Sequence, residues 1–139
     1  MKALRQRPAL STEGWQHFMN DTFSMDEKLY RAVWPPEIYE LFWRRDGSVS
    51  SAAFADPKGL SVDRGDYRSD ADVISDMNKR FTGRIIRLYV KNCMDTGCLV
   101  RYLPSKKNPF HCEIHGSEKT VLLSKQQRFN LSKKAVVVF

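Results

Sequence analysis

Residues 108–116 read Asn-Pro-Phe-His-Cys-Glu-Ile-His-Gly, and this stretch predicts a β-strand with one apolar and one polar face. Side chains alternate between the two faces of a strand, so residues two apart share a face. The apolar face then carries Phe110, Cys112 and Ile114. The polar face carries His111, Glu113 and His115. Pro109 is tolerated where a strand opens and Gly116 can close it, whereas a helix confined between them would be too short to be stable.

The polar row His111-x-Glu113-x-His115 places a base, an acid and metal-ligating side chains next to one another. Residues two apart on a strand are separated by about 7 Å, so Glu113 and one histidine can reach the same ion or substrate group. The two histidines are about 13 Å apart and share a metal only where the strand bends or bulges. We interpret the row as a catalytic site, metal-assisted or not, or as the solvated face of an edge strand.

The composition is that of one globular domain. Of the 139 residues, 42% are hydrophobic and 28% are charged, which is typical of a domain with a hydrophobic core. No apolar run approaches the roughly 20 residues that span a membrane, and no apolar segment follows the basic N-terminal residues as in a secretory signal. Three cysteines show no evident disulfide framework, so we expect a reduced protein in the cytoplasm.

The hydrophobic pattern predicts a single α+β domain over residues 25–139, preceded by an N-terminal extension over residues 1–24. We expect a mostly antiparallel sheet of five or six strands, mostly linked by hairpins, with two or three helices on one face. The expected strands cover residues 28–33, 48–54, 60–64, 84–92, 98–103 and 110–115. The expected helices cover residues 36–45, 69–82 and 125–135, and residues 136–139 form a last strand or a packed tail.

Two of the expected helices carry capping signals. In each, a serine side chain is expected to accept a hydrogen bond from the backbone N–H three residues further on. The two pairs are Ser69 with Asp72 and Ser124 with Gln127. The helix after Pro36 is expected to bury a stripe formed by Ile38, Leu41 and Phe42. Two hairpins are expected, one joining 48–54 to 60–64 and the other joining 84–92 to 98–103.

The net charge of +7 is unevenly distributed along the chain. Residues 1–78 carry 10 Lys and Arg against 13 Asp and Glu, whereas residues 79–139 carry 13 against 3, so the two parts have net charges of −3 and +10. Such an asymmetry predicts a polyanionic partner, or pairing of the oppositely charged halves within one chain or between two subunits. The alternative is a solvated basic surface.

We therefore predict a small cytoplasmic accessory protein that binds a polyanion, the backbone of nucleic acid, through its basic second half. No aromatic spacing typical of a base-stacking platform accompanies these cations, so we expect little sequence preference. The alternative is an enzyme centred on the His-x-Glu-x-His row that acts on a phosphate-containing substrate. The residues predicted to contact nucleic acid are Arg84, Arg87, Arg101, Lys106, Lys107, Lys125, Arg128 and Lys133.

A zinc site is a weaker interpretation of the cysteines. Cys93-x4-Cys98 followed by Cys112-x2-His115 offers two pairs of zinc-binding side chains. The spacing of the first pair is looser than usual, and strand alternation sends Cys112 and His115 to opposite faces. We therefore predict three ordinary half-buried thiols and no metal ligands.

The order of Arg31, Ser50-Ser51 and Glu113 along the chain resembles the Arg–Ser–Glu layout of ADP-ribosyltransferase folds. The resemblance implies that Arg31 holds phosphates, that a serine orients a ribose and that Glu113 drives transfer. The chain departs from that pattern in the short separation between Arg31 and Ser50. It also has His111 where the family has an acid or glutamine two residues before its glutamate.

Three further stretches resemble a set of small uncharacterised prokaryotic proteins, from bacteria or phages. They are Ser50-Ser-Ala-Ala-Phe54, Gly59-Leu-Ser-Val-Asp-Arg64 and Asn108-Pro-Phe-His111 with Glu113 and Gly116. The resemblance covers most of the chain from Met25 on. It implies a bacterial or phage accessory protein and carries no activity with it.

Overall fold

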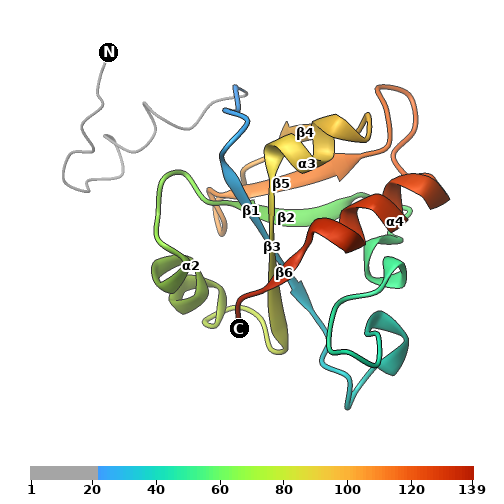
Figure 1. Ribbon diagram of the computed structural model, residues 1–139. Helices are drawn as coiled ribbons and strands as arrows, with labels where there is room; N and C mark the ends of the chain where they lie inside the picture. Colours follow the sequence, from blue (N-terminus) through green and yellow to red (C-terminus); the bar gives the residue numbers. More distant parts are fainter. Residues whose placement is uncertain (1–21) are drawn as a thin grey trace.

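The computed structural model describes residues 22–139, which form one six-stranded sheet in the order β4-β5-β2-β1-β3-β6 (Figure 1). All neighbouring strands are antiparallel. The strands are β1 (Lys28–Val33), β2 (Leu60–Arg64), β3 (Arg84–Tyr89), β4 (Leu99–Tyr102), β5 (His111–His115) and β6 (Val136–Val137). The helices are α2 (Asp70–Met77), α3 (Val90–Asp95) and α4 (Lys125–Lys134), with two 3-10 helices, η1 (Glu40–Phe42) and η2 (Ser51–Phe54). The predicted single α+β domain is confirmed.

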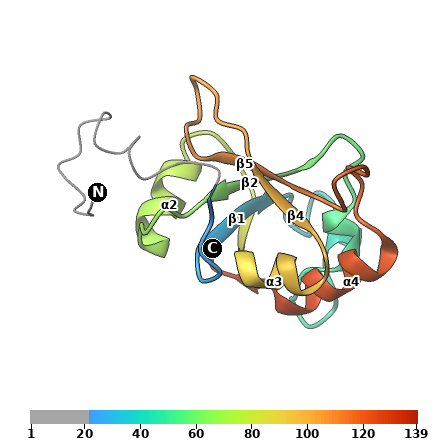
Figure 2. The same ribbon diagram turned by 90° about the horizontal axis from the view of Figure 1, so that it is seen from above.

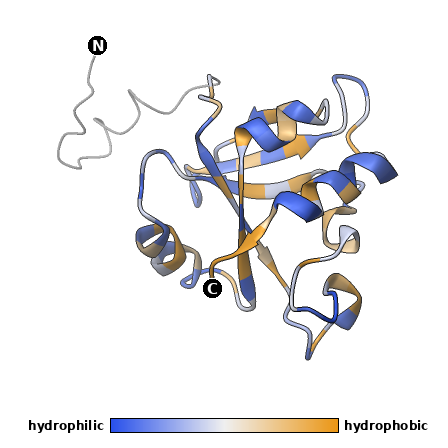
Figure 3. Cartoon of the chain, viewed as in Figure 1, coloured by the Kyte–Doolittle hydropathy of each residue, from blue (hydrophilic) through white to orange (hydrophobic). Residues whose placement is uncertain are grey.

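Helices cover both faces of the sheet, as Figures 1 and 2 show, and not one face as predicted. The larger core cluster joins one face to α3, α4 and η2. On the opposite face, Tyr30 of β1 and Ile85 of β3 pack against Val73 and Met77 of α2. This second cluster takes its strand residues from β1 and β3, and the side chains of β5 on the same face are polar. In Figure 3, α4 is largely hydrophilic while β6, which follows it, is hydrophobic.

The two predicted helix starts are confirmed by their capping contacts. The Ser69 hydroxyl accepts a hydrogen bond from the backbone of Asp72, and α2 follows. The Ser124 hydroxyl accepts from the backbone of Gln127, whose side chain accepts from the backbone of Ser124 in return. The prediction for α2 was too long, because the helix ends at Met77, well short of residue 82. The residues that follow form turns around Gly83, which has a positive φ of 113°.

The predicted helix over residues 36–45 and the predicted strand over residues 48–54 are both wrong. Residues 36–38 form a turn, η1 is a single 3-10 turn, and η2 replaces most of the strand. Ile38 is 64% exposed and Leu41 is 67% exposed, so the expected buried stripe does not form. In place of the helix, Trp43 and Val49 form a short bridge that folds this segment back on itself.

The two predicted hairpins are also wrong, because the strands pair with more distant partners. β2 lies between β1 and β5, and β3 lies between β1 and β6. The chain leaves β3 at Tyr89 and enters α3, where the side chain of Asn92 accepts a hydrogen bond from the backbone of Tyr89. β4, which follows α3, pairs with β5.

A buried ion pair supports the centre of the sheet. The Arg64 guanidinium makes two hydrogen bonds of 2.8 Å to the carboxylate of Glu27, one to each oxygen. Arg64 also lies over the rings of Phe23 and Tyr102. Because both charged side chains are almost fully buried, each depends on the other for compensation of its charge.

Two sequence-based expectations concern the ends and the environment of the chain. The predicted extension over residues 1–24 lies outside the described residues, apart from its last three positions. Across residues 22–139, no helix has both the length and the apolar character needed to cross a membrane.

Candidate active site

β5 presents the predicted polar row on one face of the sheet. His111, Glu113 and His115 are partly exposed, while Cys112 and Ile114 between them are buried in the core. The predicted alternation is therefore confirmed. β5 is an interior strand between β4 and β2, so the interpretation of the row as the face of an edge strand is wrong.

Glu113 is held in place through His115. His115 Nε2 lies 2.8 Å from Oε1 of Glu113, and Nε of Arg101 donates to Nδ1 of His115 at 3.2 Å. Because an arginine N–H can only donate, Nδ1 of His115 must accept, and the proton of the neutral ring then lies on Nε2. His115 therefore donates to Glu113, and the carboxylate is fixed by a neutral histidine that is itself oriented by Arg101.

The second oxygen of Glu113 faces His111. Oε2 lies 3.7 Å from Nε2 of His111, within the range of an ion pair but too long for a hydrogen bond. Nδ1 of His111 has no hydrogen-bond partner within residues 22–139, so this nitrogen is available to a ligand. The carboxylate rests on the backbone of Gly59, where an added Cβ would lie 2.3 Å from Oε1.

His111 lines a cleft of about 610 Å³ at the junction of β1 and β2. These strands pair only at Leu29 with Arg64 and at Tyr30 with Asp63, and beyond these positions they separate. Such a volume suits a small organic ligand. The polar side chains that line the cleft include Arg31, Asp56, Ser61, Asp63, Arg80 and His111. Glu113 and His115 lie outside the lining, behind His111.

Arg31 enters this cleft from β1. Its Nε donates to the carbonyl of Ala53 at 3.1 Å, and NH1 donates to the carbonyl of Ser61 at 2.9 Å. Burial lowers the pKa of the Arg31 guanidinium to about 10, an effect that Asp56 opposes, so the side chain remains charged at neutral pH. No ion pair joins Arg31 to a carboxylate within residues 22–139, which leaves a charged donor facing the cleft.

Asp63 and Arg80 are site residues that sequence reasoning missed. The Asp63 carboxylate is buried, accepts from NH2 of Arg80 at 2.8 Å and from the side chain of Asn108 at 2.9 Å, and lies opposite His111 in the strand register. The signal was present in β2, since Asp63 falls on the face opposite to the apolar Leu60 and Val62. Arg80 follows a helix, and its approach to Asp63 has no signal in the local sequence.

The layout of an ADP-ribosyltransferase is only partly reproduced. Arg31 lines the cleft, but Ser50 and Ser51 do not, and Glu113 lies behind His111. The Ser50 hydroxyl donates to the carbonyl of Leu41. These two serines lie at the start of η2, not on a strand as the resemblance requires.

The geometry of the polar row does not suit a metal. Nε2 of His115 carries a proton because Arg101 occupies Nδ1, and a metal needs an unprotonated nitrogen. For the zinc alternative, Cys112 and His115 lie on opposite faces of β5 as predicted, and all three thiols are fully buried. Burial raises the pKa of Cys98 to about 11 and that of Cys112 to about 12, so neither ionises readily to the thiolate that binds zinc.

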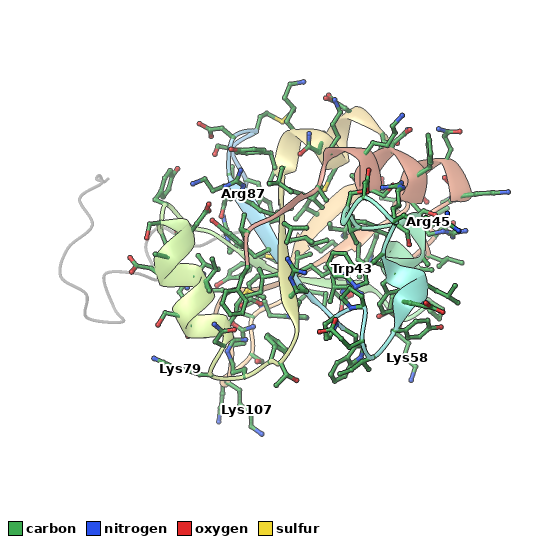
Figure 4. All side chains as sticks on the ribbon, turned by 60° about the horizontal axis from the view of Figure 1, so that its bottom comes forward. Trp43, Arg45, Lys58, Lys79, Arg87 and Lys107 are labelled. Atoms are coloured by element: carbon green, nitrogen blue, oxygen red, sulfur yellow. The ribbon has the colours of Figure 1, made fainter. Side chains whose placement is uncertain are left out.

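The eight residues predicted to contact nucleic acid do not form one surface. The loop with Lys106 and Lys107 lies well apart from α4 in Figures 1 and 2. Arg87, labelled in Figure 4, forms an ion pair with Asp70. Arg101 donates a hydrogen bond to His115. The others are Arg84 on β3 and Lys125, Arg128 and Lys133 on α4.

The chain matches no family model, and comparisons with curated proteins and with solved structures found no match.

Proposed function

We propose that the protein is an enzyme that uses His111 as a general base on a phosphate-containing substrate bound in the cleft. The observation that carries this proposal is the position of His111. His111 lines the cleft, and its Nε2 lies 3.7 Å from a carboxylate oxygen of Glu113. A histidine in a cleft with a carboxylate beside one ring nitrogen is an arrangement typical of general-base catalysis.

The proposed proton transfer runs through the ring of His111. Nδ1 of His111 accepts the proton of the attacking water or substrate hydroxyl, and the Nε2–H of the resulting imidazolium points to Glu113. Glu113 remains a carboxylate throughout and stabilises this imidazolium, and His115 keeps it oriented. The proton then passes from Nδ1 to the departing oxygen of the substrate. Arg31 supplies the positive charge that holds the phosphate.

The test compares variants that keep the shape of the site. We expect His111→Gln and Glu113→Gln to lower turnover by about 100-fold or more, since general acid–base catalysis contributes about 10² to 10⁴. Glu118→Gln, in the exposed turn after β5, is the matched control and keeps full activity. Turnover is followed over a panel of phosphate mono- and diesters, with thermal unfolding as the check on folding. Full activity of His111→Gln in a folded protein contradicts the proposal.

Nucleic-acid binding remains a second proposal, restricted to one part of the basic surface. Asp63 is contacted by both Arg80 and Asn108, so their neighbours Lys79 and Lys107 lie at one end of the molecule (Figure 4). These exposed lysines and Lys106 offer a small cationic patch beside the cleft.

The nucleic-acid proposal is tested by titrating labelled single- and double-stranded DNA and RNA at several salt concentrations. The Lys106→Glu/Lys107→Glu double variant is compared with Lys125→Glu/Lys133→Glu on α4. We expect only the first to weaken binding and to reduce the salt dependence, by a log–log slope of about 0.7 to 0.9 for each lost phosphate contact. Equal effects of the two variants contradict binding at this patch.

A further inference from the structure

The cleft has an aromatic wall that is partly exposed to solvent. Trp34 and Phe81 both line the cleft, and they are 49% and 42% exposed. Val33 pairs with Arg84 in the sheet, so Trp34, which follows β1, and Phe81, which precedes β3, leave the sheet at the same end. Large aromatic side chains are normally among the groups with most to gain from burial. Two of them exposed in one cleft indicate a surface for a flat ring.

Tyr30 of β1 also lines the cleft but is fully buried, and Phe42 adds a further aromatic side chain from η1. Its ring stacks on that of Tyr39 with centroids 4.2 Å apart and an interplanar angle of 13°. Phe42 is partly buried against the main core, so it is held more firmly than Trp34 and Phe81. Beside the buried ring of Tyr30, the cleft therefore combines one partly buried ring, Phe42, with two exposed ones.

The guanidinium of Arg31 lies in the same cleft. Two of its five N–H groups are used by the carbonyls of Ala53 and Ser61, which leaves donors for a ligand. Arg80, by contrast, is already paired with Asp63 and Asp76. A half-buried cation whose hydrogen bonds go to neutral carbonyls gains most from an anion that brings its own charge into the cleft.

We infer that the cleft binds a nucleoside monophosphate, with its base against Trp34 and Phe81 and its phosphate on Arg31. A ring and a phosphate on one small molecule satisfy the aromatic wall and the free cation together, and about 610 Å³ accommodates a ligand of this size. The inference rests on the proposed function for its choice of this cleft, and adds the class of substrate.

The direct test is isothermal titration of the full chain with AMP and with CMP. Two further probes separate the parts of the ligand: adenosine has the ring without the phosphate, and ribose 5-phosphate has the phosphate without the ring. We expect AMP and CMP to bind with a Kd below about 1 mM. Each of the two partial ligands should bind at least about tenfold more weakly than AMP.

Variants then assign each part of the ligand to its residues. Trp34→Ala should weaken AMP binding by about fivefold or more, the usual size of a base–aromatic contact, and leave ribose 5-phosphate unchanged. Its matched control is Phe129→Ala, on α4 outside the cleft and 45% exposed. Arg31→Gln should weaken AMP and ribose 5-phosphate but not adenosine. Its control is Arg128→Gln, a partly buried arginine that also donates to a backbone carbonyl.

Several outcomes overturn the inference. They are no binding of AMP or CMP at about 1 mM, adenosine or ribose 5-phosphate binding as tightly as AMP, or AMP binding unaffected by both Trp34→Ala and Phe81→Ala. If Arg31→Gln does not fold, as judged by thermal unfolding, the comparison of AMP with adenosine on the unaltered protein decides the role of the phosphate.

The inference and the proposed function fail separately. If the unaltered protein and His111→Gln both bind nucleotide and neither shows turnover, the enzyme proposal is contradicted and the proposed binding site is supported. If the protein turns over simple phosphate esters but binds no nucleotide, the proposed nucleotide site is contradicted and the proposed role of His111 is supported.

Discussion

Gly59→Ala is expected to displace the carboxylate on which the proposed mechanism depends. An added Cβ would lie 2.3 Å from Oε1 of Glu113 and 2.6 Å from Cδ. Ordinary contacts between non-bonded heavy atoms are about 3.5 Å, so the carboxylate must move by about 1 Å. That movement breaks the 2.8 Å hydrogen bond from His115 and turns Glu113 away from His111. A misplacement of about 1 Å in a catalytic group costs about 100-fold in rate.

The matched control is Gly47→Ala. Gly47 and Gly59 both have positive φ, at 90° and 119°, but nothing lies within 4 Å of a Cβ added at Gly47. Both substitutions therefore carry a backbone cost of about 1–3 kcal/mol, and only Gly59→Ala moves Glu113. Comparing the two variants separates the effect of lower stability from the effect of displacing the Glu113 carboxylate.

The measurement is the ¹⁵N-edited spectrum of the histidine side chains together with denaturant unfolding. In the unaltered protein and in Gly47→Ala, we expect His115 as the Nε2–H tautomer with a hydrogen-bonded ring proton. In Gly59→Ala that signature should be lost at a comparable loss of stability. An unchanged His115 signal in a folded Gly59→Ala protein refutes the reasoning, because Glu113 would then not depend on the missing side chain at residue 59.

Two further predictions concern stability. Glu27→Ala should lower the free energy of unfolding by about 3–5 kcal/mol, since it removes the carboxylate that makes two hydrogen bonds to the buried Arg64. The double variant with Arg64→Met should recover much of this loss in urea denaturation, and equal losses in the single and double variants would contradict the pairing. Burial raises the pKa of all three thiols, Cys93, Cys98 and Cys112, in the folded protein. Below the unfolded thiol pKa of about 8.5 the thiols are protonated in both states. As the pH rises above that value, the unfolded state loses protons first and the free energy of unfolding falls. A Cys98→Ala/Cys112→Ala variant should show a smaller decrease in unfolding free energy between about pH 8 and pH 10 than the unaltered protein, and an equal decrease would count against the thiols as its source.

The local sequence was sufficient to predict those features of the fold that depend only on residues close together in the chain. The alternation over residues 110–115 predicted which side chains of β5 are polar-facing, and Ser69 and Ser124 predicted where two helices begin. Each of these features is decided within a few residues, by strand geometry or by a capping hydrogen bond. Their outcome did not depend on which strands pair.

The pairing of strands could not be predicted in the same way. Residues 84–92 and 98–103 look like a hairpin, but the capping side chain of Asn92 converts residues 90–95 into α3. Residues 36–45 look like an amphipathic helix, but the bridge between Trp43 and Val49 replaces it. In both places the preference expected from propensity and pattern gave way to another contact within the same segment.

The same limit explains why two residues of the candidate site, Asp63 and Arg80, were missed. Arg80 reaches Asp63 across 17 positions of sequence, and Arg31 reaches the carbonyl of Ser61 across 30. These contacts exist only because β2 inserts between β1 and β5, an order that no hairpin pattern predicts. Part of the positive charge in the basic half of the chain is paired with acids distant in sequence, such as Asp63 and Asp70.

The separation of β1 from β2 links the fold to the candidate site. After two paired positions the strands diverge, and the carbonyl of Ser61 then accepts from the Arg31 side chain where a backbone N–H of β1 would otherwise have served. The Arg31 side chain therefore takes the place of a neighbouring strand at the open end of the strand pair. Because the same guanidinium lines the cleft, the residue that satisfies the separated strands is also the one that presents positive charge to a ligand between them.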